Sequence, residues 1–429
     1  MKKWNPGRIC AYYLILMCSL FPLAVSPAGY ENIVETKFAV FCTLAALFLS
    51  AVIVCLMRER NACRRKWNAV QCLVLAYWGC SLLSALCSPW RKIALLGGDR
   101  LDGMITITLY CAVFLVLSRY GDAARFPLWL PAAATIVLCL VAVLQFFDLN
   151  PLYLYPGEFR WSGREQEYNG AFLSLIGNAD LTASVLCTGF AFLWPLAFWK
   201  GKRLMLLPAA LCLAVLAISG IRAGLVGAAA SVVFCLPGLI PIGKKGKRIL
   251  WAGIGLLCAL AMLAVYVFPL SGTLGEIHTT LHGQAEDSFG SGRIYIWKNT
   301  WRLVLERPLL GGGADTLGKR GLAFVKVLPD GGVIRRSIDC AHCEPLNILV
   351  NQGLFSLLFL AAAWLLSLIR AFSTNAPAAS PLRSALIAYT AASLFGIGMT
   401  ANAPFFWIIL GMLSSVTEEA TDNQRFNAI

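Results

Sequence analysis

One histidine of the sequence stands where a helix is expected to begin. His342 precedes Pro345, and proline suits the first turn of a helix, here the apolar run 346–369. The positive end of a helix disfavours a protonated imidazole and attracts anions. A neutral His342 is therefore suited to act as a general base near neutral pH, while the same helix end helps to hold a phosphate. The alternative is an interfacial histidine that only caps the helix.

Several arginines lie in turns beside apolar runs, as a binding site for an anion requires. They are Arg222, Arg293 and Arg100, which stand close to glycines, and Arg164 in the polar segment 149–178. An arginine buried among helix ends is costly unless it is paired, so a bound anion or a carboxylate is the expected partner. Snorkelling of the side chain to the surface is the alternative. Convergent arginines with one histidine suit a diphosphate leaving group better than a metal site.

Two cysteines bracket the histidine. Cys340 and Cys343 form the motif Cys-Ala-His-Cys with His342, which raises the question of a zinc or redox site. Zinc normally takes four protein ligands, and no second cysteine pair or suitably spaced histidine lies near. No paired aspartate motif for magnesium stands out either. We therefore expect no metal and no cofactor, and the two cysteines form either a local disulfide or two inert thiols.

The elements that position these residues are membrane spans. Of the 429 residues, 59% are hydrophobic and 14% are charged, against roughly 25% charged residues in soluble domains. A helix crosses the bilayer with about 20 apolar residues, and the apolar runs are continuous rather than alternating. The sequence thus predicts an all-α polytopic membrane protein of about twelve transmembrane helices. The runs are 9–25, 38–57, 69–87, 104–118, 126–147, 179–199, 204–219, 223–242, 249–270, 346–369, 384–401 and 403–416.

Basic residues orient these spans. The N-terminal lysines and the clusters at 58–66, 200–203 and 244–248 all fall on the side of the two termini. The excess of positive charge marks this side as cytoplasmic, so the net charge of +14 does not indicate nucleic-acid binding. We predict a multi-pass protein of the cytoplasmic (inner) membrane in three parts. Helices 1 to 9 occupy 1–270, a large extracytoplasmic loop between helices 9 and 10 occupies 271–345, and helices 10 to 12 with a cytoplasmic tail occupy 346–429.

The segment 271–345 is expected to carry polar chemistry, because it holds all three histidines of the chain. Ser291 is suited to cap a helix that ends near Glu306, before Pro308. The apolar stripe of this helix is expected to consist of Ile294, Trp297, Trp301 and Leu305. Such a helix would lie flat on the membrane, where tryptophans and arginines meet lipid headgroups. Glycines at 311–313 and the sequence at 329–332 indicate turns. A simple connector is the alternative.

Four motifs, taken in their order and spacing, resemble the O-antigen ligase and polymerase superfamily of bacterial membrane glycosyltransferases. The resemblance covers roughly residues 90–415. The motifs are Ile176-Gly177-Asn178-Ala179-Asp180, Ser219-Gly220-Ile221-Arg222-Ala223-Gly224, Ser291-Gly292-Arg293-Ile294-Tyr295-Ile296-Trp297 followed by 307–313, and Ala341-His342-Cys343-Glu344-Pro345-Leu346-Asn347-Ile348-Leu349 leading to Gln352-Gly353-Leu354-Phe355.

The resemblance implies transfer of a glycan from an undecaprenyl diphosphate carrier to an acceptor glycan, lipid or protein on the outer face of the membrane. It implies that His342 is the catalytic base and that Arg222 and Arg293 hold the diphosphate, with Arg100 as a further candidate. Four residues are expected to support the acceptor or the loop: Glu344, Asn347, Arg164 and Trp297. The chain departs from the family pattern at Cys343, where Asn is common, and at Ile221, where Ser or Thr is common.

Three other functions are compatible with the residues. A polymerase of the same family would use the same donor with a different acceptor. A flippase or transporter of lipid-linked glycans would bind the diphosphate without transfer, although transporters usually place ionisable groups near the middle of the bilayer. A non-catalytic scaffold is the third. Convergence of His342, Arg222 and Arg293 on one cavity would favour the enzyme.

Overall fold

The computed structural model describes residues 5–58, 67–155, 172–327 and 333–427. Within them the chain is mostly helical, because continuous apolar runs leave backbone groups no partner but their own helix. The long helices are α1 (Pro6–Cys18), extended by α2 (Leu20–Leu23), α3 (Ile33–Arg58), α4 (Ala69–Leu86), α6 (Met104–Tyr120), α7 (Trp129–Phe146), α8 (Ala179–Leu193), α9 (Leu206–Ser219), α10 (Arg222–Leu239), α11 (Lys244–Val267), α14 (Glu344–Ser373), α15 (Ala379–Ser393) and α16 (Ala403–Asn427).

Short elements join them. They are α5 (Arg91–Leu96), the 3-10 turns η1 (Ala123–Arg125), η2 (Trp194–Phe198), η3 (Arg203–Met205) and η4 (Leu317–Lys319), the helices α12 (Gly272–Leu281) and α13 (Phe289–Glu306), and the strands β1 (Ala323–Val327) and β2 (Val333–Ser337). The two strands pair antiparallel with Ala323 opposite Ser337. The helical fold class is confirmed, and this hairpin is an exception that the prediction overlooked, although both strands contain β-branched residues.

A helix stands at each of the twelve predicted apolar runs, but the described residues support about eight membrane spans. Eight helical segments are long and apolar enough to cross a bilayer, with α1 and α2 counted together. Two others, Met104–Tyr120 and Arg203–Ser219, are apolar but shorter. Two more fall outside both groups: α15 is 15 residues long and carries Arg383, and α16 continues into a polar tail. The number twelve therefore stays a prediction.

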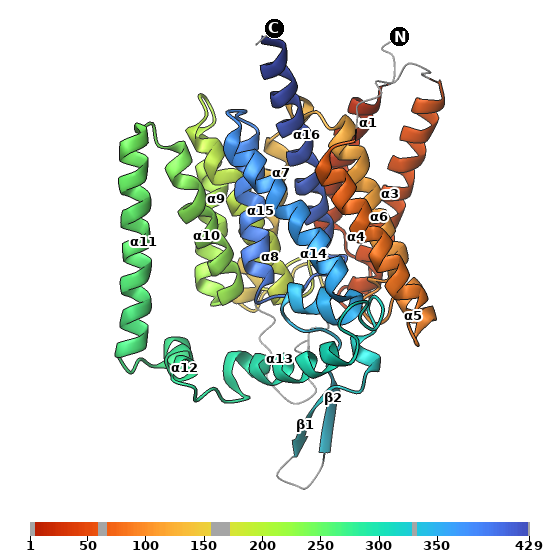
Figure 1. Ribbon diagram of the computed structural model, residues 1–429, viewed down its shortest axis with the longest axis vertical. Helices are drawn as coiled ribbons and strands as arrows, with labels where there is room; N and C mark the ends of the chain where they lie inside the picture. Colours follow the sequence, from red (N-terminus) through yellow and green to blue (C-terminus); the bar gives the residue numbers. More distant parts are fainter. Residues whose placement is uncertain (1–4, 59–66, 156–171, 328–332, 428–429) are drawn as a thin grey trace.

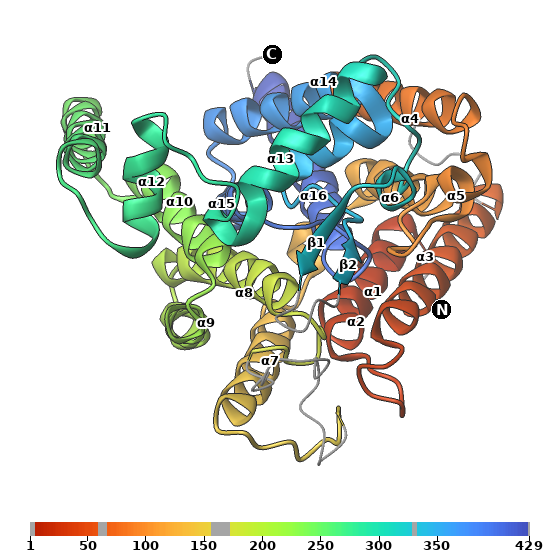
Figure 2. The ribbon, with the colours of Figure 1, turned by 90° about the horizontal axis from the view of Figure 1, so that it is seen from below.

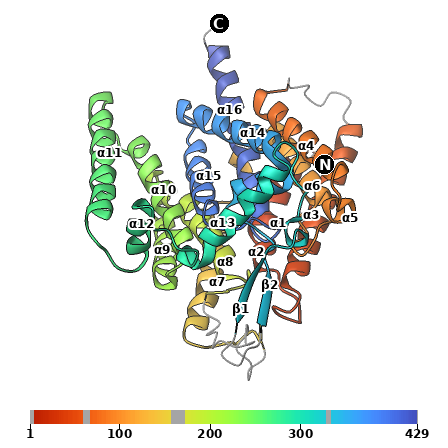
Figure 3. The same cartoon turned by 60° about the horizontal axis from the view of Figure 1, so that its bottom comes forward.

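The bundle has two distinct ends (Figure 1). α1 begins and α16 ends at one of them, called here the terminal end. The opposite end, called the loop end, carries α5, α12, α13 and the hairpin of β1 and β2 (Figures 1 and 3). The described elements of the segment 271–345 therefore lie together at one end of the bundle, and the division of the chain into three parts stays a prediction.

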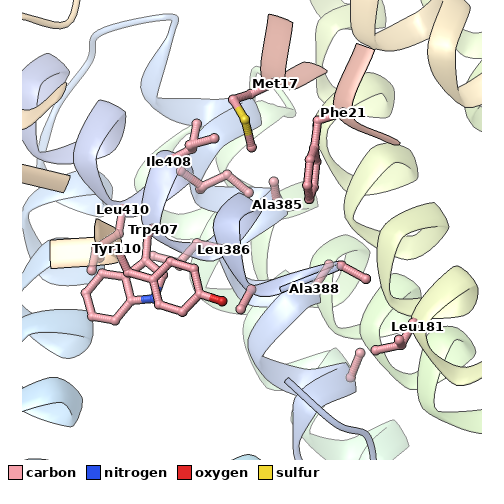
Figure 4. Close-up of a cluster of buried hydrophobic side chains, with 14 of the residues drawn as sticks. Met17, Phe21, Tyr110, Leu181, Ala385, Leu386, Ala388, Trp407, Ile408 and Leu410 are labelled. Carbon is pink, nitrogen blue, oxygen red and sulfur yellow. The ribbon is translucent and has the colours of Figure 1, made fainter. Parts of the chain in front are cut away.

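Side chains from helices far apart in sequence fill the middle of the bundle (Figure 4). The rings of Tyr110 and Trp407 stack with centroids 6.1 Å apart, and Met17 and Phe21 are fully buried. α10 and α15 approach closely because Gly227 lies against the backbone of Ala388, where a Cβ would come within 2.6 Å of the carbonyl oxygen. In contrast, α11 stands apart at the edge of the bundle and has no buried residue (Figures 1 and 2).

α13 runs across the loop end and packs on α14 (Figure 2). Its regular part begins only at Arg293, because Gly290, Ser291 and Gly292 all have left-handed backbone angles. The prediction that Ser291 caps this helix is therefore wrong, whereas its end at Glu306 is confirmed. Thr300 and its neighbours Ile296 and Val304 form the buried face. The predicted apolar stripe with Trp301 is displaced from this face, and Trp301 is 51% exposed.

α14 is broken at Gly353, and the predicted glycine turn docks into the break. Gly353 has φ +85°, and a Cβ there would meet the carbonyl of Leu309. The backbone nitrogens of Gly312 and Gly313 donate to the carbonyls of Val350 and Asn351 at 3.0 and 2.6 Å. The glycines at 311–313 thus fix the end of α13 against α14. The turn expected at 329–332 lies outside the described residues.

Candidate active site

His342 stands two residues before the start of α14, at the loop end of the bundle. It is half-buried, and its φ of +48° is unusual for a residue other than glycine. Two hydrogen bonds to the neighbouring Ala341 hold this strained backbone. The indole Nε1 of Trp297 donates to the Ala341 carbonyl at 3.0 Å, and the Ala341 nitrogen donates to Oδ1 of Asn347 at 3.4 Å. Trp297 and Asn347 therefore both support the histidine loop.

The imidazole of His342 is held in its neutral form. Burial lowers its pKa from the ordinary value, and the charges of Arg100 and Arg293 lower it further. Asp180 and Asp339 act in the opposite direction without reversing the shift. Nδ1 is buried and has no hydrogen-bond partner among the described residues. A neutral imidazole with an uncommitted nitrogen is suited to accept a proton.

Arg293 lies near this histidine and is only loosely engaged. Its Nη1 donates to the Gly290 carbonyl at 2.9 Å, and its Nη2 lies 3.9 Å from Oδ2 of Asp180. Nε is buried without a hydrogen-bond partner in the part of the chain that the structure describes. The left-handed turn before Arg293 is fixed by Gly292, which packs under the ring of Phe324. The guanidinium therefore keeps donors for a ligand.

Arg100 is engaged much more firmly. Its Nε and Nη2 donate to the two carboxylate oxygens of Asp339, each at 3.0 Å, and the residue is 8% exposed. Only Nη1 is left, and it is buried without a partner among the described residues. Because Asp339 stands three residues before His342, this bidentate pair anchors the histidine loop. The geometry favours a positioning role for Arg100 over direct contact with a diphosphate.

Arg222 is the first residue of α10, at the same end of the bundle as His342 and Arg293. Gly224, two positions further along α10, packs on Ala183 of α8, so Arg222 lies near the end of α8 that carries Asp180. The Arg222 side chain is exposed and makes no ion pair or hydrogen bond within the described ranges. The structure brings Arg293 close to His342, whereas no contact among the described residues joins Arg222 to either of them. Arg164 lies outside the described residues.

Glu344 fixes the start of the helix that follows His342. As the first residue of α14, it accepts a hydrogen bond from the Gly398 nitrogen at 3.1 Å, which ties α14 to the turn between α15 and α16. Asn347 also accepts from Nδ2 of Asn351 at 3.2 Å, and Oδ1 of Asn351 accepts from Leu317 at 3.1 Å. These contacts are structural supports of the loop.

Sequence reasoning missed a group of aspartates. Asp339 and Asp180 pair with the arginines, and Oδ2 of Asp315 accepts from the nitrogens of Gly98 and Asp102 at 2.6 and 3.2 Å. Burial raises the pKa of Asp102 to about 8, with the charges of Asp315 and Glu344 adding to the effect. The charged residues between Gly98 and Gly103 were a visible sign of polar interactions. Their partners, however, lie too far away in the sequence to be inferred.

The two cysteines beside the histidine are free thiols. Burial raises the pKa of Cys340 to about 11 and also raises the pKa of Cys343, so neither is activated as a thiolate. Within the described ranges, no three His, Cys, Asp or Glu side chains gather closely enough to hold a metal ion.

Fold and site together define a class: a mostly helical polytopic membrane protein whose histidine and arginines gather at one end of the bundle. Residues 207–361 match the family model described as O-antigen ligase. The match confirms the resemblance to the O-antigen ligase superfamily and runs from α9 into α14, including Arg222, Arg293 and His342. No curated protein matches the chain. The family indicates glycosyl transfer of the ligase or polymerase type, with a lipid-linked glycan and an acceptor as partners.

Proposed function

We propose that this protein transfers a glycan from an undecaprenyl diphosphate carrier to an acceptor hydroxyl. The observation that carries the proposal is the pairing of His342, neutral and with an unpartnered Nδ1, with Arg293, whose donors are incompletely used. A base and an uncommitted guanidinium are the two groups that such a transfer requires. Arg222, exposed at the start of α10, is proposed as the second ligand of the diphosphate.

In the proposed step, the acceptor oxygen attacks the anomeric carbon of the donor glycan. His342 takes the hydroxyl proton as the new carbon–oxygen bond forms. The bond from the anomeric carbon to the diphosphate breaks on the opposite face, so the configuration inverts and the electron pair leaves with the diphosphate oxygen. Arg293 and Arg222 offset the charge that develops there. We assign no metal or cofactor to this step.

We place the reaction on the outer face of the cytoplasmic membrane. The proposal is supported by the basic residues at the terminal end, among them Lys200, Arg203, Lys244 and Arg248, because excess positive charge marks the cytoplasmic side. The loop end, with His342 and Arg293, would then face the periplasm or the cell exterior. Trp301, exposed on α13, is placed to meet the headgroup layer there.

The acceptor is the open part of the proposal. Ligase and polymerase share the donor and differ in whether the acceptor is a lipid, a protein or a growing glycan. A transporter would use the same arginines but has no need of a base. The neutral, unpartnered His342 therefore favours the enzyme over the transporter.

The test is a reaction of the purified full-length protein with an undecaprenyl diphosphate oligosaccharide and a set of candidate acceptors, with and without a chelator. We expect transfer and release of undecaprenyl diphosphate, both lost in His342→Ala and strongly reduced in Arg293→Ala. Matched controls in the same segment are His278→Ala, in α12, and Arg302→Ala, on α13, and both should keep activity.

Activity that survives His342→Ala would remove the proposed base, and inhibition by the chelator would remove the metal-independent mechanism. Donor movement across proteoliposomes without release of diphosphate would instead establish the transporter. Donor binding separates the two roles, because it should persist in His342→Ala and weaken in Arg293→Ala.

A further inference from the structure

A large apolar cavity lies inside the bundle, away from the His342 loop. Its volume is about 450 Å³, and its walls come from α1, α7, α8, α15 and α16. Aliphatic and aromatic side chains, among them Val185 and Phe405, make nearly all of the lining. The cavity extends from Phe405 to Met412 of α16, or about 10 Å along that helix.

The mouth of the cavity lies at the terminal end of the bundle. The lining there comes from the η1–α7 junction, the η2–η3 connection and the start of α15, all of which are at that end. Trp129, Trp199 and Lys202 belong to this rim. Two indoles and a lysine beside an apolar opening are typical of the level at which lipid headgroups lie.

The charge at this rim is positive. Lys200 and Arg203 flank Lys202, and all three side chains are exposed. Asp122, next to the lining residue Ala123, is paired with Arg125 of the same turn. The uncompensated charge at the mouth is therefore cationic, which favours an anionic headgroup.

An apolar space of this size does not suit water, because buried water needs two to four polar partners. Left empty, it would cost the packing contacts of its walls. In a membrane the available filler is a hydrocarbon chain. A chain threaded from the His342 site would bring only its tail to the mouth, and a tail gives Lys202 no partner. A lipid whose head lies at the terminal end satisfies both the apolar depth and the cationic rim.

We propose that this cavity binds an acyl chain of an acidic phospholipid from the leaflet at the terminal end, with the lipid phosphate beside Lys202. The site is separate from the proposed glycosyl transfer and does not depend on it. Its physical role is to fill the space between α7 and the α8–α15–α16 core.

Native mass spectrometry of the purified full-length protein tests the proposal, with phosphatidylglycerol and phosphatidylcholine of identical chains as probes. We expect one retained phosphatidylglycerol per chain and about fivefold weaker binding of phosphatidylcholine. Val185→Phe and Ala134→Phe, which fill the cavity from α8 and α7, should abolish retention of both lipids. Val226→Phe, which adds the same bulk at an exposed position of α10, should keep it.

The rim is tested separately, with no change to the core. Lys202→Gln should remove the preference for phosphatidylglycerol while chain binding persists, and Lys244→Gln, an exposed lysine at the same end, should not. The proposal would be overturned if both cavity-filling variants elute and melt as the parent does and still retain lipid. Displacement of phosphatidylglycerol by stoichiometric undecaprenyl phosphate would assign the cavity to the carrier instead. If neither filling variant folds, equal preference in Lys202→Gln and the parent overturns the proposal.

Discussion

Arg100 and Asp339 form a bidentate ion pair that joins two connections of the loop end. The guanidinium donates through Nε and Nη2 to both carboxylate oxygens at 3.0 Å, across 239 positions of sequence. The pair holds the turn before α6 against the chain that leads into His342. Because Arg100 lowers and Asp339 raises the pKa of His342, the two residues affect the same base in opposite directions.

Substitutions of Arg100 and Asp339 should therefore shift the pH profile of kcat in opposite directions. If His342 is the base, kcat is lost as the pH falls through its pKa, which lies below the ordinary value of 6.5. Arg100→Gln should move this acid limb to higher pH, and Asp339→Asn should move it to lower pH. We expect kcat to fall roughly tenfold or more in both, with a smaller change in KM for the donor, because breaking a buried pair disturbs the loop. The measurement is the pH dependence of kcat for undecaprenyl diphosphate release.

Asp99→Asn is the matched control for this pair. Asp99 neighbours Arg100 but lies 4.0 Å from Lys319 in an exposed ion pair, which contributes little. It should leave both kcat and the acid limb unchanged. Shifts in the same direction for Arg100→Gln and Asp339→Asn would show that the pair does not act on the histidine by charge.

The positions of the helices were predictable from the sequence because each apolar run is continuous and bounded by polar turns. Helices α8, α10 and α14 begin within two residues of the predicted starts at 179, 223 and 346. The hairpin carried a signal that was overlooked, since β-branched residues stand on both sides of the turn sequence 328–332. The left-handed turn at Gly290 to Gly292 carried none beyond its glycines, because Ser291 also adopts it.

The candidate site was likewise predictable from the sequence only in part. His342 and Arg293 were predicted because each stands at a helix start within a recognisable motif. The partners of the arginines, Asp339 and Asp180, lie in other parts of the chain. Asp180 ends one of the recognised motifs and Asp339 belongs to none, but neither position indicates which arginine it pairs with. Sequence therefore indicates which residues begin helices, whereas the pairing between loops depends on how α6, α8 and α14 pack.

The indole of Trp297 gives a test of loop support. Trp297→Phe keeps an aromatic ring near Phe395, at a centroid distance of 6.3 Å in the parent, but removes the donor to Ala341. We expect stability to fall by about 1 kcal/mol and kcat to fall several-fold, because His342 loses one of its two adjacent anchors. Trp301→Phe, at an exposed position on the same helix, is the control. Equal kcat in the two variants would contradict the anchoring role.

The break in α14 predicts that alanine substitutions of two helical glycines will differ markedly in their effect on stability. Gly353→Ala places a Cβ 2.1 Å from the Leu309 carbonyl at a φ of +85°, so we expect a loss of about 1–3 kcal/mol or more. Gly253→Ala, in the unpacked α11, meets nothing within 4 Å and should be neutral or stabilising by up to about 1 kcal/mol, because alanine favours the helix. Thermal unfolding in detergent measures both. A Gly353→Ala protein as stable as the parent would mean that α14 straightens and the turn at 311–313 undocks.

The buried carboxyl of Asp102 predicts how stability depends on pH. Its pKa of about 8 in the folded protein stands above the ordinary value of 3.8, so the folded state binds the proton more tightly than the unfolded chain. The resulting stabilisation is fully present below about pH 3.8 and is lost as the pH rises through about 8. Asp102→Asn keeps a neutral group of similar size and should remove this dependence of stability on pH.

We expect the parent's Tm to fall between pH 5 and pH 9 more steeply than that of Asp102→Asn, which becomes the more stable protein above about pH 8. Asp99→Asn, at an exposed position three residues before Asp102, should follow the parent. Parallel curves for the parent and Asp102→Asn would mean that Asp102 is charged in the folded protein, stabilised by Arg100 and Tyr110 beyond the cost of its burial.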